Sequence, residues 1–184
     1  MMQKLRTIEM NRLSVEDFKQ ADKLPLIVVL DNVRSLHNVG SVFRTCDAFR
    51  VEAVYLCGIT ATPPHAEIHK TALGAEDSVA WHYFKTADEA LEKLHESGVL
   101  VYSVEQAHES TSMEGLAVSP GQRYAVVLGN EVKGVQQSVV DASDGCLEIP
   151  QFGTKHSLNV SVAAGIVVWE FAKKMWLDAE NTNF

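Results

Sequence analysis

The stretch that decides the fold is PLIVVLDNVRSLHNVGSVFRTCDAF, residues 25–49. It opens with a short apolar run, Leu26–Leu30, and passes through a polar loop into a helix-like segment at 38–49. The apolar run has no alternating polar positions, which indicates a strand buried on both faces. The helix-like segment carries one apolar stripe, which should face a sheet: Val39, Val42, Phe43, Cys46 and Phe49. A buried strand followed by an amphipathic helix is the repeating unit of a parallel α/β sheet.

The same alternation continues along the chain on the C-terminal side of this stretch. Further helical patterns lie near 87–97 and 135–142, and a last helix is expected from Ser157 to about Met175. Strands that alternate with helices predict an α/β fold, with a parallel sheet and helices on both faces. Five more short apolar runs are predicted strands: Ala53–Cys57, Val79–Phe84, Val99–Val104, Tyr124–Leu128 and Gly145–Ile149.

The length of 184 residues predicts one main domain with short additions at its ends. Residues 1–24 read as a polar appendage with one short helix, for which Ser14 is a suitable N-cap and Asp17 supplies the carboxylate three residues later. The domain itself is expected to cover 25–176. Residues 177–184 would then form a short C-terminal tail.

Composition places the chain among ordinary globular proteins, with 46% hydrophobic and 22% charged residues. No apolar run is long enough to cross a membrane, and the N-terminus lacks the apolar segment of a secretory leader. The three cysteines are odd in number and form no C-x-x-C pair, which favours a reducing cytoplasm over a disulfide framework or a zinc site. The net charge of −8 is unusual for a nucleic-acid-binding protein, although a local basic stripe can coexist with an acidic remainder.

Three loops that follow predicted strands are chemically unusual, and in parallel sheets such loops gather at the edge where ligands bind. In the first loop, Asn38 can cap the following helix, and Gly40 allows another backbone to approach closely. Arg44 lies off the buried stripe, about one turn from the start of the helix. It can be read as a solvated surface charge or as a guanidinium that binds phosphate.

The second loop lies in VVLGNEVKGV, residues 126–135. Gly129 directly follows a buried strand and would let a ligand approach the main chain, and Gly134 permits a turn into the next helix. Asn130 and Glu131 place two polar side chains at the tip of the strand. A plain strand–turn–helix connection is the alternative interpretation of this loop.

The third loop opens IPQFGTKHSLNVSVAAGIVVWEF, residues 149–171. Ser157 can cap the long helix, and Asn159 and Ser161 put polar groups in its first turns. The segment 162–169 is apolar almost all round, which predicts a buried helix. A polar cluster at the start of such a helix exceeds what a cap requires and indicates part of a ligand site.

Two other patterns carry less weight. His65 and His69 have the i,i+4 spacing of metal ligands, but the pattern is not H-E-x-x-H and no third ligand is evident, so we predict no metal site. The chain also lacks G-x-G-x-x-G after its first strand, which disfavours a nucleotide- or NAD-binding enzyme of the Rossmann type.

Taken in order, the three loops resemble the three motifs of the SpoU/TrmH branch of the SPOUT methyltransferases. The motifs read Asn38-x-Gly40-x-x-x-Arg44, Leu128-Gly129-Asn130-Glu131-x-x-Gly134, and Ile149-Pro150 followed by Ser157-Leu158-Asn159-Val160-Ser161-x-Ala163. The segment KTALGA at 70–75 also resembles a stretch that this branch carries between its first two motifs. The resemblance covers about residues 26–169.

The resemblance implies a SPOUT-type parallel sheet with a C-terminal trefoil knot, although knots are otherwise essentially absent from proteins. It implies a homodimer that transfers the methyl group of S-adenosyl-L-methionine (SAM) to a ribose 2′-hydroxyl in tRNA or rRNA. The residues that match cofactor-binding positions are Val104, Gln106, Leu128, Gly129, Ile149 and Leu158. Those that match catalytic positions are Arg44, Asn38, Glu131, Ser157 and Asn159.

Arginine stays protonated at neutral pH, so Arg44 is expected to clamp a phosphate and stabilise the developing alkoxide rather than act as a simple base. Arg44, Ser157 and water remain the candidates for the final proton acceptor. By the same resemblance, Asn38, Glu131 and Asn159 would orient Arg44 and the ribose.

Two alternatives keep the same fold: a non-catalytic RNA-binding protein and a SPOUT enzyme that methylates a base. Many relatives carry an additional RNA-binding domain, and here the N-terminal 24 residues offer only five cations: Lys4, Arg6, Arg12, Lys19 and Lys23. The tail ending NTNF is not basic either. The sequence therefore leaves the RNA and its nucleotide open.

Overall fold

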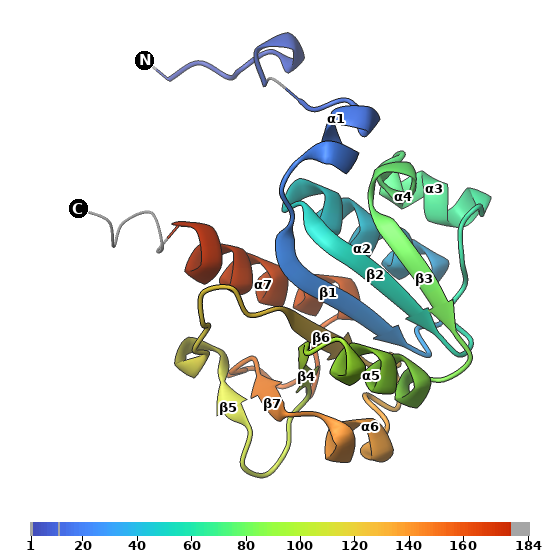
Figure 1. Ribbon diagram of the computed structural model, residues 1–184, viewed down its shortest axis with the longest axis vertical. Helices are drawn as coiled ribbons and strands as arrows, with labels where there is room; N and C mark the ends of the chain where they lie inside the picture. The colour runs from blue at the N-terminus through green and yellow to red at the C-terminus, as the bar shows by residue number, and fades with distance from the viewer. Residues whose placement is uncertain (1, 11, 178–184) are drawn as a thin grey trace.

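The computed structural model describes residues 2–10 and 12–177. Its centre is one seven-stranded sheet in the order β3-β2-β1-β6-β4-β7-β5, in which every strand pairing is parallel (Figure 1). The strands are β1 (Leu24–Asp31), β2 (Val51–Cys57), β3 (Ala80–Phe84), β4 (Leu100–Val104), β5 (Thr111–Ser112), β6 (Tyr124–Leu128) and β7 (Gly145–Glu148).

Helices cover both faces of this sheet, so the predicted α/β class is confirmed. The helices are α1 (Val15–Gln20), α2 (Leu36–Ala48), α3 (Ala66–Ala72), α4 (Ala75–Ser78), α5 (Ala87–Glu96), α6 (Gln137–Ala142) and α7 (Val160–Ala172). Shorter turns are the 3-10 turns η1 (Thr7–Met10) and η2 (Met113–Gly115) and the π-helical turn η3 (Lys173–Leu177).

The two layers of the core follow from the alternation of side chains along β1. Leu26, Val28 and Leu30 join the core beneath α2 and α7. Ile27 and Val29 join the core beneath α5 and α6. All five are at most 1% exposed, as expected for a strand buried on both faces. Each such side chain contributes about 1.5–3 kcal/mol through its removal from water.

The run at 79–84 was expected to be a strand buried on both faces, and this prediction was wrong. β3 is the edge strand of the sheet and pairs only with β2 among the described strands. Its side chains are exposed or half-buried, and Tyr83 is 50% exposed. Apolar and aromatic composition alone does not distinguish an edge strand from a central one.

The starts of two helices also differ from the expectation. α2 begins at Leu36, and its N-cap is Ser35, whose side chain accepts a hydrogen bond from the Asn38 amide, whereas Asn38 was the predicted cap. α7 begins at Val160, and its N-cap is Asn159 rather than Ser157. In both cases the residue that caps is the one whose side-chain oxygen reaches an amide of the first turn.

α7 was predicted to be buried all round, and in the described chain it is not. Ala164, Val167, Val168 and Phe171 are fully buried against the sheet. Another stripe of the same helix, with Leu158 just before its start, lies in solvent: Leu158 is 38% exposed, Val162 51%, Ile166 38% and Trp169 47%.

The N-terminal helix α1 begins as predicted, because the Ser14 side chain accepts a hydrogen bond from the Asp17 amide at 3.0 Å. Phe18 of this helix is 5% exposed and packs into the main core. Of the predicted C-terminal tail, Leu177 ends η3, and 178–184 lie outside the described residues. Within the described ranges, no helix is long and apolar enough to span a membrane.

Candidate active site

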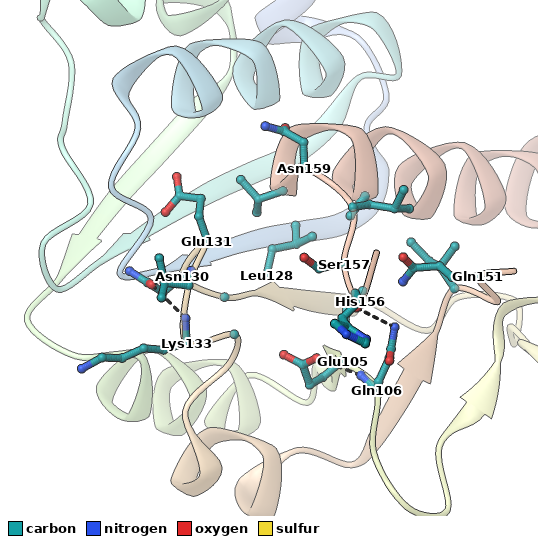
Figure 2. Close-up of a pocket in the computed structure, with 18 residues that line it drawn as sticks. Glu105, Gln106, Leu128, Asn130, Glu131, Lys133, Gln151, His156, Ser157 and Asn159 are labelled. Carbon is teal, nitrogen blue, oxygen red and sulfur yellow. Dashed lines mark hydrogen bonds between the residues drawn. The ribbon is translucent and has the colours of Figure 1, made fainter. Parts of the chain in front are cut away.

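A cavity of about 590 Å³ lies at the carboxyl ends of three neighbouring strands, β6, β4 and β7 (Figure 2). The chain runs β1–β2–β3 toward one edge of the sheet and places β4, β7 and β5 on the other side, so the cavity is near the reversal of strand order where parallel sheets bind ligands. Its lining residues are Val104, Glu105, Gln106, Leu128, Gly129, Asn130, Glu131, Val132, Lys133, Gly134, Ile149, Gln151, His156, Ser157, Leu158, Asn159, Val160 and Ala163.

The loop after β6 forms one wall and is folded tightly on itself. The Asn130 side-chain oxygen accepts hydrogen bonds from the Val132 amide at 2.9 Å and the Lys133 amide at 3.1 Å. A side chain at Gly129 would meet the carbonyl carbon of Gly134 at 2.1 Å. The glycine is thus required by the approach of the chain's own backbone. The sequence-based prediction, that this glycine makes room for a ligand, is therefore not needed to explain it.

Glu105 fixes the far end of this loop to β4. Its carboxylate accepts hydrogen bonds from the Val135 amide at 3.1 Å and the Gln106 amide at 2.9 Å. Gly134 takes the left-handed conformation, with φ +69°, and so makes the predicted turn toward α6. The loop is therefore held in one shape by hydrogen bonds from main-chain amides to the Asn130 and Glu105 side chains.

The segment between β7 and α7 forms the opposite wall, and its main chain is largely free. Gln106 donates from Nε2 to the His156 carbonyl at 3.0 Å. Within the described part of the chain, that is the one hydrogen bond made by residues 150–158. Amide and carbonyl groups in this wall are consequently available to a ligand.

One hydrogen-bond network joins all three motif loops. Glu131 accepts hydrogen bonds from the Arg34 amide at 2.9 Å, the Ser35 amide at 3.0 Å and the Asn38 side chain at 3.0 Å. The Asn38 oxygen in turn accepts from Asn159 Nδ2 at 3.2 Å. The predicted residues Asn38, Glu131 and Asn159 therefore lie together, at the start of α2 and of α7.

The environment of Glu131 favours its ionised form. Burial alone would raise the pKa of this carboxyl group, but the hydrogen bonds from Arg34, Ser35 and Asn38 outweigh burial, and the pKa lies below its ordinary value of 4.5. At neutral pH the group is a carboxylate that accepts several donors. It therefore orders the first motif loop.

Arg44 lies apart from the main cavity. It is exposed on α2 and lines a second cavity of about 410 Å³ between α2 and α3, with Ser41, Thr45, Ala48, Phe49, Lys70 and Thr71. Within the described chain, Arg44 makes no hydrogen bond to Asn38, Glu131 or Asn159. The predicted site residues thus divide into two groups on a single chain.

The six predicted cofactor residues line the main cavity, as do Glu131, Ser157 and Asn159 of the predicted catalytic set. Glu105 lies in the stretch from Val104 to Gln106 that the resemblance places beside the cofactor pocket, and it lines the cavity. Sequence reasoning gave no role to three further polar side chains in that lining: Lys133, Gln151 and His156 (Figure 2). Their position after β6 and β7 was the available signal, since polar residues that follow parallel strands gather at one edge.

His65 and His69 each have another partner. The His65 ring caps α3 by accepting from the Glu67 amide at 3.1 Å, and His69 is hydrogen-bonded to Glu76 at 2.6 Å. No cluster of three or more His, Cys, Asp or Glu residues that could hold a metal ion occurs among the described residues.

An all-parallel α/β sheet with a cavity built from three post-strand loops defines a ligand-binding protein of the doubly wound class. Residues 25–169 match the SpoU rRNA Methylase family, and the chain belongs to this family. The resemblance stated from the three motifs is thereby confirmed.

Individual relatives agree with this assignment. The chain is 30% identical over 171 residues to a 23S rRNA (guanosine-2′-O-)-methyltransferase of Neisseria meningitidis, with 92% of this chain and 67% of the relative covered. It is 34% identical over 148 residues to a tRNA (guanosine(18)-2′-O)-methyltransferase of Aquifex aeolicus, with 79% and 67% covered. A crystal structure of an A. aeolicus TrmH/SpoU tRNA modifying enzyme superposes with a TM-score of 0.77 at 27% identity, covering 91% of this chain and 83% of that one.

The rRNA-modifying relatives are longer than this chain, which spans 67%, 66% and 55% of three of them.

Proposed function

We propose that this protein transfers the methyl group of SAM to a ribose 2′-hydroxyl of tRNA or rRNA. Its family and the activities for which its relatives are named support this function. The single observation that carries it is the Glu131–Asn38–Asn159 network, which joins the three motif loops at the mouth of the strand-end cavity. A generic strand–turn–helix connection would not bring residues so distant in sequence to one network.

The lining of the main cavity fits SAM. Its apolar side chains suit an adenine ring, and the free amides and carbonyls of 150–158 can meet the polar edges of a nucleoside and an amino acid. When bound, SAM would supply an electrophilic methyl carbon. The residues that would hold it are Val104, Gln106, Leu128, Gly129, Ile149 and Leu158.

Arg44 is the residue that we assign to the ribose. A 2′-hydroxyl is a weak acid, so its attack requires stabilisation of the developing alkoxide and placement within about 3–3.5 Å of the methyl carbon. The Arg44 guanidinium can hold the adjacent phosphate by two parallel hydrogen bonds while its charge stabilises the alkoxide. Ser157 and Asn159 lie in the cavity wall, where they can orient the ribose. The proton of the 2′-hydroxyl passes to water, directly or through the Ser157 hydroxyl, because a charged guanidinium has no lone pair to accept it.

The division of the site residues supports a homodimer. Arg44 lines a different cavity from the proposed cofactor residues, so a second copy that brings its own Arg44 to the strand-end cavity would complete one active site. The stripe Leu158, Val162, Ile166 and Trp169 is the surface that we assign to this contact, because an apolar patch of this kind marks an interface.

Three further features belong to the same proposal. Residues 149–159 would pass through the loop after β6 to form a trefoil knot, consistent with both segments lining one cavity. Residues 25–176 would hold the catalytic domain, against which the preceding segment packs through Phe18. The protein acts in the cytoplasm, in keeping with the free thiols of Cys46, Cys57 and Cys146.

Calorimetry with SAM tests the cofactor assignment. We expect binding in the micromolar range and a rise in melting temperature, because a ligand that binds only the folded state stabilises it. NADH is the matched control, since it also carries an adenosine but belongs to a different class of enzyme. Binding of NADH without binding of SAM would overturn the assignment.

A further inference from the structure

The groove that contains Arg44 lies where α2 packs closely on α3. A side chain at Gly40 would meet Thr71 Oγ1 at 2.2 Å and the Ile68 carbonyl at 2.3 Å, so only glycine permits this approach. Thr71 Oγ1 also donates a hydrogen bond to the His37 carbonyl at 2.9 Å. The two helices are therefore fixed to each other beneath the groove.

The lining of this groove is suited to an anion. Its two charged residues are both cations, Arg44 of α2 and Lys70 of α3, and none of the described residues that line it carries a carboxylate. Ser41 and Thr45 add two hydroxyl groups, whereas the hydroxyl of Thr71 already donates to the His37 carbonyl. Such a lining stands out on a chain whose net charge is −8.

Lys70 forms an exposed ion pair with Glu67 that a bound phosphate could replace. Its ammonium group contacts Glu67 at 2.6 Å, and the same carboxylate is hydrogen-bonded to His37 at 3.0 Å. The Lys70 side chain is 63% exposed. Exposed ion pairs of this kind contribute only about 0–1 kcal/mol, so a phosphate in the groove can replace Glu67 as the partner of Lys70.

We propose that Lys70 and Arg44 together form a subsite for a backbone phosphate of the RNA substrate in the α2–α3 groove. The inference rests on the proposed function and extends it to a residue of α3. Arg44 supplies a planar two-pronged donor and Lys70 a mobile point charge, which can meet different oxygens of one phosphate. Lys70 is a positioning residue, because it places the strand and does not touch the reacting atoms.

The test compares Lys70→Ala and Lys70→Arg with Lys93→Ala. Lys93 is a matched control: it lies on α5, is 62% exposed and pairs with Glu96 three residues away at 3.1 Å. The probe is a fluorescein-labelled, unstructured RNA of about 20 nucleotides, whose binding is followed by anisotropy over a salt series. Inorganic phosphate is titrated in a separate arm, because a free phosphate could use the same chemistry.

We expect Lys70→Ala to bind the RNA about 3–10-fold more weakly and to lower the salt dependence by about 0.7–0.9, the value for one lost phosphate contact. Lys70→Arg should recover most of the affinity, and Lys93→Ala should match the wild type. In methyl-transfer assays with RNA from a strain that lacks the gene, Lys70→Ala should raise the KM for RNA and leave kcat and SAM affinity nearly unchanged.

Equal affinity and equal salt dependence in Lys70→Ala and Lys93→Ala would overturn the subsite. It would also be overturned if Lys70→Ala weakened the binding of inorganic phosphate while RNA binding stayed unchanged. Failure of the proposed function looks different, because the wild-type protein would then neither bind SAM nor methylate RNA.

Discussion

At the scale of single residues, the main finding is that Arg44 lies outside the cavity that the proposed cofactor residues line. Arg44 lies off the buried stripe of α2, and its neighbours Phe43 and Cys46 point into the core. Among the described residues, no hydrogen bond or ion pair of the folded chain requires an arginine at that position. Its contribution should therefore appear in catalysis and not in folding.

Arg44→Ala should lower the rate of methyl transfer by about 10²–10³, the range for loss of one transition-state donor, with melting temperature and SAM affinity nearly unchanged. Arg44→Lys should also be slow, because an ammonium group cannot make the two-pronged contact. Tritiated methyl transfer beside a melting curve separates the possibilities. Full activity in Arg44→Ala would refute the mechanism, and early melting with loss of SAM would show that the residue is structural.

The ionisation of Glu131 should make the stability of the folded protein depend on pH. The pKa of this carboxyl group is lowered in the folded protein, so its stabilising effect is complete above the ordinary value of 4.5 and is lost as pH falls through the lower folded value. Glu131→Gln should cost about 1–2 kcal/mol at pH 7, because the amide nitrogen that replaces one carboxylate oxygen cannot accept a hydrogen bond from the Arg34 or Ser35 amide. Denaturant unfolding from pH 7 to pH 3 should show a shallower decline in the variant than in the wild type.

Glu96→Gln is the control for this titration, since Glu96 holds only an exposed ion pair on α5. An equally steep acid transition in Glu131→Gln and wild type would show that the network does not govern stability.

At the scale of elements, α7 shows what the periodicity of apolar residues can predict about a helix and what it cannot. The apolar run at 162–169 correctly predicted a helix, but a run that is apolar on all sides cannot reveal which side meets the sheet and which meets solvent. The structure places Val167 and Val168 inside and Val162 and Ile166 outside. The outer stripe then remains available to a second copy.

Ile166→Glu should shift the protein from dimer toward monomer, because a charge in an apolar contact must be desolvated without a partner. Analytical ultracentrifugation at micromolar concentration measures the change, and the circular dichroism of the monomer should remain native-like. Ile59→Glu, at a position that is 66% exposed and far from α7 in sequence, should leave the association unchanged. A wild-type protein of about 20 kDa at that concentration would contradict the dimer.

The sequence predicted the strands of the sheet well where buried apolar runs are flanked by polar turns, as in β1, β2 and β6. It missed α3, α4 and β5, which are short and carry weak local patterns. The caps at Ser35 and Asn159 were assigned to neighbours because several residues in each loop have side chains that can cap. The hydrogen bond between Asn38 and Glu131 joins residues more than ninety positions apart, and local sequence patterns cannot predict a contact over such a separation.

At the scale of the whole molecule, the parallel sheet brings three distant loops to one edge, and the proposed dimer brings a second Arg44 to that edge. The acidic chain would meet RNA through a small number of localised cations rather than through its overall charge. A protein of this design needs no large basic surface at the reacting nucleotide. We expect any preference for one RNA to depend on contacts outside the cavity.

The most direct test locates the transferred methyl group. The protein is incubated with tritiated SAM and RNA from a strain that lacks the gene, and the RNA is digested to nucleosides and separated. We expect the label in a 2′-O-methylated nucleoside, and in a second sample of undigested RNA the adjacent phosphodiester bond should resist alkaline cleavage. Label on a base, or SAM binding without transfer to any RNA, would contradict the proposed function.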